Sequence, residues 1–488
     1  MPQDREKEHD EDLRENPRRR HLILLLSTLW PVVLGGAWLW SGARDGVWGV
    51  VLGWPPGALL FAAGLSDLLW AGNARIRHFM AFGSLLGTVL AIPYFAVAGP
   101  AAAVLLVLSA TGFVLTGYAS LVREKLPEGV PQPKIGVKLA ARAAEDEASM
   151  CYLALTTWPL LTGERARRVS EEAEAALALF DEKGWLARPA LYHRTPPPVN
   201  EVRVRRRHVR RTAFEQITYE SGYEPHPAEP GYERWLSYES NRTACAWVLR
   251  HEGEQRPWLV CIPGIRMGSP RLDLSLFEPD YLHRELGLNV LIPVLPTHGP
   301  RKIGLISGDR VLSGDIMDTL HAASQALWDI RRITVRLRLE GAPAIGVLGH
   351  SLGGYVAALL CGLERDLECV VASNPPSDYP DMFWNAAPSA AVKSLEASGL
   401  DERKLALLSR VISPLALDPL LPPERLAIFA GNADRVVPPS QPERLWRHWG
   451  SPRIVWYEGS HQGLLSHPKI REQLPAILST AGLLEEPS

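Results

Sequence analysis

Residues 344–363 read AIGVLGHSLGGYVAALLCGL, and this stretch decides how the rest of the chain is interpreted. The apolar run 344–348 predicts a short strand, and the following run rich in alanine and leucine, Tyr355 to Leu363, predicts a helix. Between them lies the motif G-x-S-x-G, with Ser351 at its centre. In such an elbow the serine hydroxyl is exposed at the top of a sheet, and glycines are required where a Cβ would clash with the neighbouring strand and helix. Ser351 is therefore a candidate nucleophile.

The composition excludes several other kinds of chemistry. The chain has 488 residues and a net charge of −2, which gives no indication of nucleic acid as a partner. It has no H-E-x-x-H motif, no paired cysteines at ligand spacing and no G-x-x-x-x-G-K-[ST] loop, so we expect neither a metal nor a cofactor. Cys261, Cys361 and Cys369 lie in apolar runs, which predicts buried free thiols and a reducing compartment. Protein partners are unknown.

The first quarter of the chain has the composition of a membrane protein. After a polar tail, 1–21, the region 22–122 contains apolar spans of about 20 residues, each enough to cross a ~30 Å hydrocarbon core. A basic segment followed by an apolar stretch also fits a signal peptide, but three further spans favour retained helices. The spans are Leu22–Trp40, Val47–Leu69, Met80–Ala98 and Ala101–Leu121.

The basic residues of the short loops predict an orientation. Arg18 to Arg20 precede the first span, Arg75 and Arg77 lie between the second and third, and Arg123 follows the fourth. Because lysine and arginine concentrate in cytoplasmic loops, both termini are predicted to be cytoplasmic. The protein is thus expected to be integral to an inner or cell membrane, with everything after residue 122 on the cytoplasmic side.

Residues 123–213 are predicted to be a linker followed by a helical and basic segment. Ala140–Tyr152 and Arg165–Phe180 have helical apolar spacing. The run Val202–Arg211 is strongly basic and has two interpretations. It could contact anionic lipid beside the membrane, or it could be a strand or helix with a solvated basic face.

From 214 to 488 the sequence alternates between short apolar runs and helical patterns. This alternation predicts an α/β domain, with a mostly parallel sheet and helices on both faces. Two of the runs, Thr243–Leu249 and Trp258–Ile262, are predicted to form a strand pair, and Leu274–Leu286 is predicted to be a helix. Segment 375–421, which includes the helical run Ala390–Val411, lies where a cap over an apolar pocket could be inserted.

A serine hydroxyl needs a base to remove its proton and an acid to orient that base. Asp434 and His461 each follow a short apolar run, in the order serine, acid, histidine. Ligands of such sheets bind at the carboxyl ends of the strands, so both residues are well placed for these roles. His298 is a rival base and Asp381 a rival acid, whereas Asp315 precedes a long helix and is interpreted as a cap or first-turn acid.

Two backbone N–H groups are expected to stabilise the oxyanion. One is that of Leu352, the residue after the nucleophile, and the other is assigned to Ile265, with Gly264 allowing close backbone approach. The same loops supply the predicted substrate-binding residues, which are Gly264, Arg266, His298 and His350.

These motifs together resemble the α/β-hydrolase superfamily, from about Phe214 to the C-terminus. They are 262–265 (IPGI), 349–353 (GHSLG), 431–434 (GNAD) and 459–461 (GSH), and the chain departs from many members by having Pro263 where they have histidine. The resemblance implies the α/β-hydrolase fold and attack by Ser351 on a carbonyl through a covalent acyl-enzyme. The expected substrate is a small-molecule or lipid ester. An acyltransferase, a peptidase or thioesterase, and a non-catalytic membrane-tethered binding domain are the alternatives.

Overall fold

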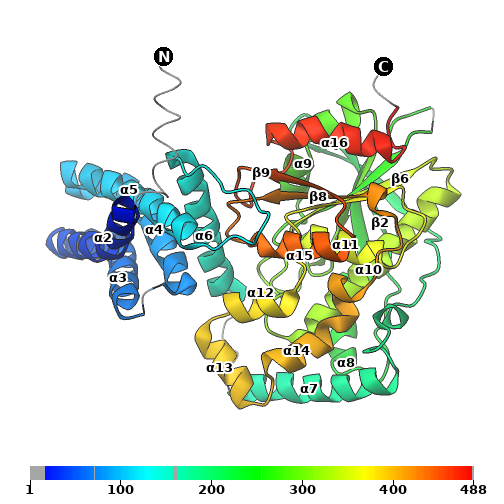
Figure 1. The fold of residues 1–488 in the computed structure, drawn as a ribbon, viewed down its shortest axis with the longest axis horizontal. Coiled ribbons are helices and arrows are strands. Elements are labelled where there is room, and N and C mark those ends of the chain that lie inside the picture. Colours follow the sequence, from blue (N-terminus) through cyan, green and yellow to red (C-terminus); the bar gives the residue numbers. More distant parts are fainter. Residues whose placement is uncertain (1–16, 71, 158–162, 254, 486–488) are drawn as a thin grey trace. The chain divides into compact units, whose positions relative to one another are not determined.

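The computed structural model describes residues 17–70, 72–157, 163–253 and 255–485, and Figure 1 shows its elements. Residues 1–16 of the predicted polar tail lie outside the described residues. The chain forms two compact units, and the first consists of Met1–Leu155 with two short later segments, Gly431–Pro439 and Glu458–Gln462. The second unit consists of Thr156–Ala430, Ser440–Tyr457 and Gly463–Ser488.

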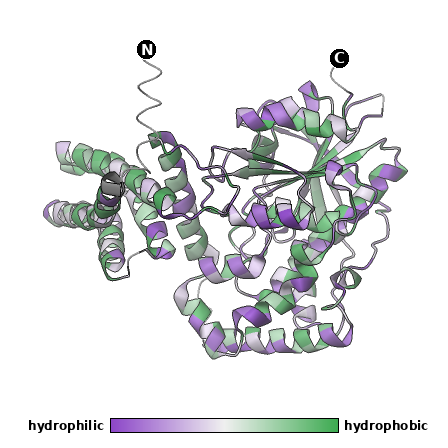
Figure 2. Cartoon of the chain, in the orientation of Figure 1, coloured by the Kyte–Doolittle hydropathy of each residue, from purple (hydrophilic) through white to green (hydrophobic). Residues whose placement is uncertain are grey.

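The first unit begins with four helices that are long enough and apolar enough to cross a membrane: α2 (Pro17–Arg44), α3 (Gly46–Leu69), α4 (Ala74–Ala98) and α5 (Pro100–Arg123). Hydrophobic residues dominate these helices (Figure 2). Large apolar side chains also face outward, since Ile92 is 69% exposed and Val107 63% exposed. An apolar surface of this kind is expected where lipid replaces water as the solvent.

Polar contacts at the helix ends show that the four helices run alternately up and down. Asp67, near the end of α3, forms an ion pair of 3.6 Å with Arg123 at the end of α5. Tyr94, near the end of α4, bonds to Ser41 (2.9 Å) and Asp45 (2.5 Å), at the end of α2 and just beyond it. The C-terminal ends of α2 and α4 therefore lie together, and so do those of α3 and α5. This arrangement agrees with the alternation expected from the loops.

A fifth helix, α6 (Val137–Thr157), packs closely on α5. A Cβ on Gly117 of α5 would lie 1.8 Å from the carbonyl oxygen of Ala140, so only glycine permits this approach. A small apolar cluster continues the contact into the first of the later segments. Its buried members are Leu121, Val122, Ile135, Ala143 and Ala433.

The second unit is built on a nine-stranded sheet with the strand order β1-β2-β3-β5-β4-β6-β7-β8-β9. β4 pairs in parallel with β5 and β6, and β6, β7 and β8 continue in parallel, whereas β1, β2 and β3 are antiparallel. The strands are β1 (Arg203–Val209), β2 (Thr212–Glu220), β3 (Thr243–Leu249), β4 (Trp258–Ile262), β5 (Asn289–Val294), β6 (Ile345–His350), β7 (Cys369–Ser373), β8 (Leu426–Gly431) and β9 (Arg453–Tyr457).

One predicted strand pairing is wrong. The runs Thr243–Leu249 and Trp258–Ile262 are both strands, but they do not pair with each other, because β5 lies between them and pairs with both. The connection that follows β4 crosses the face of the sheet and places β5 between β3 and β4. These two strands are consecutive in the sequence but are not neighbours in the sheet.

Helices cover both faces of the sheet, with α9 and α16 on one face and α10, α11 and α15 on the other (Figure 1). Their bounds are α9 (Pro270–Phe277), α10 (Ile316–Leu339), α11 (Leu352–Cys361), α15 (Ser440–His448) and α16 (Pro468–Thr480). The helix predicted over Leu274–Leu286 is instead split. α9 ends at Phe277, Glu278 has a positive φ of 38°, and a π-helical turn, η3 (Asp280–Glu285), follows.

A further helical layer forms where the cap is predicted. The expected run Ala390–Val411 is interrupted at Gly399, whose φ of +95° ends one helix before Asp401 caps the next through the N–H of Lys404. This layer packs on α7, where Ser170 Oγ donates to the Ser398 carbonyl at 2.6 Å. Its helices are α12 (Tyr379–Ala386), α13 (Ser389–Ala397) and α14 (Glu402–Leu408), and the helix on which it packs, α7, is Gly163–Glu182. That it covers a substrate pocket remains a prediction.

The basic run around 202–211 forms the edge strand β1, so the sheet begins before Phe214. Nearly all of the side chains of β1 are exposed, which is typical of an edge strand protected by charge. Short helices complete the described chain: α8 (Tyr232–Leu236), η1 (Pro189–Tyr192), η2 (Glu239–Arg242), η4 (Gly299–Arg301), η5 (Ser409–Ile412), η6 (Pro414–Ala416) and η7 (Pro423–Arg425).

Candidate active site

Ser351 occupies the turn between β6 and α11 in a conformation that L-residues rarely adopt. Its φ is 55° and its ψ is −122°, and its N–H donates to the carbonyl of Ser373 on β7 at 2.9 Å. Such a backbone costs about 1–3 kcal/mol and persists where the surrounding structure enforces it. A strained serine between a strand and a helix is the geometry of a nucleophile elbow.

The two glycines of the motif are needed for this turn. A Cβ on Gly349 would lie 2.1 Å from the carbonyl oxygen of Gly353, and a Cβ on Gly353 would lie 1.9 Å from that of Ile262 on β4. Both distances are far below any normal contact. The clash expected from the sequence is thus confirmed, and it explains why α11 can start so close to the sheet.

The loop after β4 lies directly beside the serine. A Cβ on Gly264 would lie 3.2 Å from Ser351 Cβ and 3.7 Å from its Oγ, so the missing side chain leaves space next to the hydroxyl. Leu352 is the first residue of α11, and its N–H therefore has no acceptor within the helix. Ile265 follows in the turn after Gly264. Their roles as oxyanion donors stay predictions.

Asp434 and His461, the predicted acid and base, are brought together. His461 Nδ1 donates to Asp434 Oδ2 at 2.7 Å, because a carboxylate can only accept. Asp434 Oδ1 accepts from the N–H groups of Val436 and Val437, both at 2.8 Å, which fixes the carboxylate. Burial lowers the pKa of His461, but the charge and hydrogen bond of Asp434 outweigh it, so that this pKa is raised.

A second carboxylate, missed by the sequence analysis, lies beside this pair. Asp146 on α6 is fully buried, and its Oδ2 accepts from the N–H groups of His461 (2.9 Å) and Arg435 (3.0 Å). The signal that could have found it is an acidic residue on the apolar face of a helix, where charge is seldom tolerated without a partner.

The rival base, His298, is buried in a different environment. Its Nδ1 lies 2.8 Å from the carbonyl oxygen of Pro296, two residues earlier. Burial lowers the pKa of its imidazole to about 4. Its Nε2 lies close to Gly308, where a Cβ would be 2.3 Å away. His298 therefore contributes to the packing of the loop after β5.

The other predicted substrate-binding residues have structural contacts. Arg266 donates to the carbonyl of Ser307 (3.0 Å) and to the hydroxyls of Thr156 (2.9 Å) and Thr157 (2.5 Å). His350 is the buried last residue of β6, with Nδ1 3.4 Å from Ser373 Oγ. Binding of substrate by Arg266 and His350 remains a prediction.

Asp381 and Asp315, the other acids considered, form ion pairs. Asp381 pairs with Arg444 at 3.0 Å and also accepts from Gln441. Asp315 precedes α10 as expected, but its side chain makes no capping bond and instead pairs with Arg168 at 2.8 Å. Both contacts bind helices to one another.

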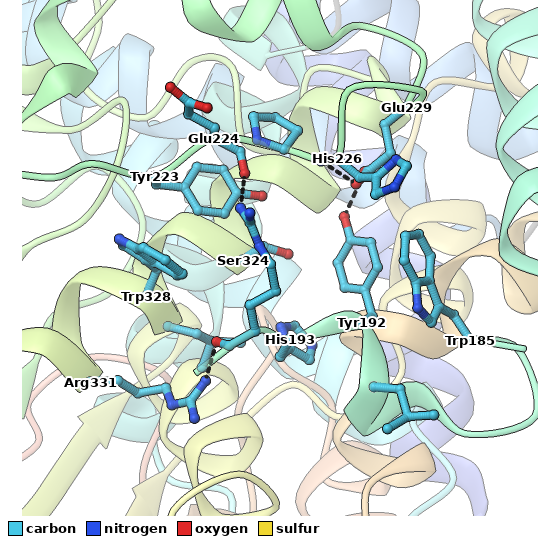
Figure 3. A pocket seen from close by; sticks show the side chains of 14 residues that line it. Trp185, Tyr192, His193, Tyr223, Glu224, His226, Glu229, Ser324, Trp328 and Arg331 are labelled. Carbon is cyan, nitrogen blue, oxygen red and sulfur yellow. Dashed lines mark hydrogen bonds between the residues drawn. The ribbon is translucent and has the colours of Figure 1, made fainter. Parts of the chain in front are cut away.

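A separate pocket in the second unit is lined by aromatic, charged and histidine side chains (Figure 3). Glu229 accepts from Tyr192 Oη and the N–H of His226, both at 2.8 Å, and burial raises its pKa to about 7. The guanidinium of Arg194 lies 5.4 Å from the centroid of the Trp328 ring. Glu229 and Arg194 thus both have partners among the other residues that line this pocket. Among the described residues no group of histidine, cysteine and acidic side chains could hold a metal ion.

The fold and the elbow define the class of this protein. The mixed, mostly parallel sheet, with its helices and a strained serine after β6, is an α/β-hydrolase fold preceded by four long apolar helices. The chain is 40% identical over 363 residues to Uncharacterized protein MT2702 of Mycobacterium tuberculosis (strain CDC 1551 / Oshkosh), a match covering 74% of this chain and 87% of that one. It is equally similar to Uncharacterized protein Rv2627c of strain ATCC 25618 / H37Rv. The chain belongs to the family of these two mycobacterial proteins.

No protein-family model matches the chain. Similar solved structures include acetyl xylan esterase 1 from Thermoanaerobacterium sp. JW/SL YS485, with a TM-score of 0.42 and 14% identity over 62% of this chain and 93% of that one. The acetyl xylan esterase from Paenibacillus sp. R4 has a TM-score of 0.42 and 16% identity over 67% and 98% of the two chains. Pyrococcus horikoshii acylaminoacyl peptidase has a TM-score of 0.35 and 14% identity over 56% and 48%. The strand order and the elbow define the fold independently of these likenesses.

Proposed function

We propose that this protein is a membrane-anchored serine hydrolase that cleaves a carboxylic ester, with Ser351 as nucleophile, His461 as base and Asp434 as acid. The observation that carries the proposal is the strained backbone of Ser351 at the turn from β6 to α11. Residues held in rarely adopted backbone conformations cluster at functional sites. The His461–Asp434 pair supplies the second part of the machinery.

The order of the strands supports this assignment. β6, β7 and β8 are parallel neighbours, so their carboxyl ends lie along one edge of the sheet. Ser351 directly follows β6, Asp434 follows β8, and His461 follows β9, the strand next to β8. Ligands of open α/β sheets bind at this edge.

In the proposed reaction, His461 Nε2 takes the proton of Ser351 Oγ as the oxygen attacks the ester carbonyl. The N–H groups of Leu352 and Ile265 stabilise the oxyanion. The attack forms a tetrahedral intermediate. When this intermediate collapses, the leaving alkoxide takes the proton from His461 and departs as the alcohol, and the acyl group remains on Ser351 as an ester. Water, activated by the same imidazole, then releases the carboxylic acid and restores the serine. Asp434 orients the imidazole and stabilises its charged form.

The four apolar helices motivate the second part of the proposal, which concerns location and substrate. They make the protein integral to a cell membrane, with the hydrolase domain on the cytoplasmic side. An enzyme held at a bilayer meets acyl chains at high local concentration, so the proposed substrate class includes lipid esters.

Labelling with a fluorophosphonate probe tests the chemistry. The full chain in detergent is expected to react, and Ser351→Ala is expected to lose all labelling. Ser237→Ala, at an exposed position after α8, is a matched control that should still label. A panel of p-nitrophenyl esters from acetate to palmitate then tests the substrate class. Hydrolysis of short esters without any cleavage of long ones in detergent would refute a lipid ester, and a wild type that never labels would refute the hydrolase.

A further inference from the structure

The proposed acid and base belong to the same compact unit as the apolar helices. Segments Gly431–Pro439 and Glu458–Gln462 contain Asp434 and His461, and they cluster with residues 1–155. The two segments are also bound to each other. The N–H of Ala433 donates to the carbonyl of Gly459 at 3.1 Å, and a Cβ on Gly431 would lie 2.6 Å from the same oxygen.

The chain between α5 and α6 holds the first of these segments. Arg435 forms an ion pair of 2.7 Å with Glu124, and Asn432 Nδ2 donates to the carbonyl of Pro131 at 3.1 Å. Ala433, between them, is fully buried against the ends of α5 and α6. The residues on either side of the proposed acid are therefore fixed by the N-terminal region.

Asp146 hydrogen-bonds to both segments. One oxygen, Oδ2, accepts from the N–H of Arg435 at 3.0 Å and from that of His461 at 2.9 Å. It thereby fixes the backbone of the base and the backbone next to the acid, while the side chains pair through Nδ1 and Oδ2. Oδ1 of Asp146 has no hydrogen-bond partner within the described part of the chain.

The neighbouring residue, Glu147, makes the corresponding contacts to the apolar helices. Its carboxylate lies 2.5 Å from Nδ1 of His78 on α4 and accepts from Ser120 on α5. Burial raises the pKa of Glu147, but His78 and Arg77 outweigh this effect and lower it to about 2. Successive residues of an α-helix project about 100° apart, so α6 can hold the loops with one side chain and the helices with the next.

The chemistry of Asp146 indicates that its oxygen matters more than its charge. Burial, followed by the charge of Asp434, raises its pKa to about 8, against the opposing effects of His461 and the two N–H groups. Burial thus favours the neutral acid, whose carbonyl oxygen still accepts two hydrogen bonds. Asparagine would preserve this acceptor, whereas a side chain without oxygen would leave the N–H groups of Arg435 and His461 without it, and an unpaired buried donor is unfavourable.

We infer that Asp146 is a positioning residue for the acid–base pair, and that α6 thereby couples the apolar helices to catalysis. This inference rests on the proposed function. It assigns to the N-terminal region a role in the reaction as well as in attachment, because the oxygen that orients the backbone of His461 comes from a helix packed on α5. A misplacement of a catalytic group by about 1 Å can reduce the rate about 100-fold.

The test compares the full chain in detergent with Asp146→Asn, Asp146→Ala and Asp146→Leu, using kcat and KM for p-nitrophenyl butyrate and the rate of fluorophosphonate labelling. We expect at least a tenfold loss of kcat in the Ala and Leu variants, with KM changed less than threefold, and near wild-type kcat in the Asn variant. Leucine fills the same space without oxygen, so it serves if alanine prevents folding. Glu145→Ala, on the exposed side of the same helix with its partner Arg142, is the matched control.

Full kcat in the Leu variant would overturn the inference, as would an Asn variant as impaired as the Leu variant. If the wild type labels and Ser351→Ala does not, such a result refutes the role of Asp146 alone. If the wild type never labels, the proposed function fails and this inference fails with it.

Discussion

Buried ionisable side chains set the chemistry of this protein at the scale of single residues. The imidazole of His461 keeps a raised pKa despite its burial because Asp434 faces it at 2.7 Å. Glu229 has its pKa raised for the opposite reason, because burial leaves its charged form poorly solvated and outweighs the hydrogen bonds of His226 and Tyr192 and the charge of Arg194. The two groups therefore predict pH effects on different properties, the first on activity and the second on stability.

Asp434→Asn tests the electrostatic part of the proposed pair. A base works only after it has lost its proton, so kcat/KM rises as the pH passes the pKa of His461. Removing the charge of Asp434 lowers this pKa, and the acidic limb of the pH profile should move to lower pH. We expect kcat to fall about 10⁴-fold, because the imidazole is no longer held in the correct tautomer. Asp381→Asn should leave the limb in place, and an unmoved limb in Asp434→Asn would contradict the pairing.

Glu229→Gln tests the pH dependence of stability. The folded protein holds the Glu229 proton more tightly than the unfolded chain does, since its pKa is raised from 4.5 to about 7. The stability that this group contributes is present below 4.5 and is lost as the pH rises through about 7, a change of about 3 kcal/mol. The difference in Tm between the variant and the wild type should therefore grow in favour of the variant over this range and then stay constant. If the Tm of the variant and the Tm of the wild type differed by a constant amount from pH 4.5 to 8, the raised pKa of Glu229 would be contradicted.

The elbow is the element on which the site depends. β6, Ser351 and α11 pack tightly because backbone carbonyl oxygens occupy the positions that side chains on Gly349 and Gly353 would take. This close approach places the start of α11, whose first N–H groups have no acceptor within the helix, directly at the serine.

Gly353→Ala is expected to be far more damaging than an ordinary glycine substitution. The added Cβ would lie 1.9 Å from the carbonyl oxygen of Ile262, so β4 and α11 must move apart. Overpacking of this kind costs about 1–3 kcal/mol and sometimes more. Gly136→Ala, where a Cβ meets nothing within 4 Å, is the matched control. Thermal unfolding of both variants provides the measurement, and equal Tm values would contradict the close packing.

The sequence predicted the elements whose signals are local. The apolar spans, the elbow and the order of Ser351, Asp434 and His461 could be read from residue patterns and turn glycines. The pairing of β5 between β3 and β4 could not, because each of the three runs is apolar and no local signal records which neighbour a strand pairs with. Asp146 was missed for a similar reason, since its hydrogen bonds join residues about 300 positions apart in the chain.

At the scale of the whole molecule, the two later segments that contain the proposed acid and base join the unit of the apolar helices. The segments that contain the proposed acid and base are therefore bound to the N-terminal region. The N-terminal 155 residues contribute to the buried surroundings of the proposed base, through Asp146 and through the apolar cluster around Ala433.

The predicted topology can be measured with reporter fusions in a bacterial membrane. Arg18 to Arg20 before the first apolar span, Arg75 and Arg77 between the second and third spans, and Arg123 after the fourth predict a cytoplasmic location for both termini. A fluorescent protein fused after residue 488 should fluoresce, and alkaline phosphatase should be active only when it is fused in the loops near 45 or 99. Alkaline phosphatase activity in a fusion at residue 488 would contradict the predicted orientation.

The central claim, that Ser351 is the nucleophile of a serine hydrolase, is tested most directly by locating a covalent adduct by mass spectrometry. After reaction of the full chain with a fluorophosphonate, peptide mapping should find one phosphonate on Ser351, and His461→Ala should slow its formation by several orders of magnitude. An adduct on another residue, or an unmodified Ser351 in folded protein, would contradict the account.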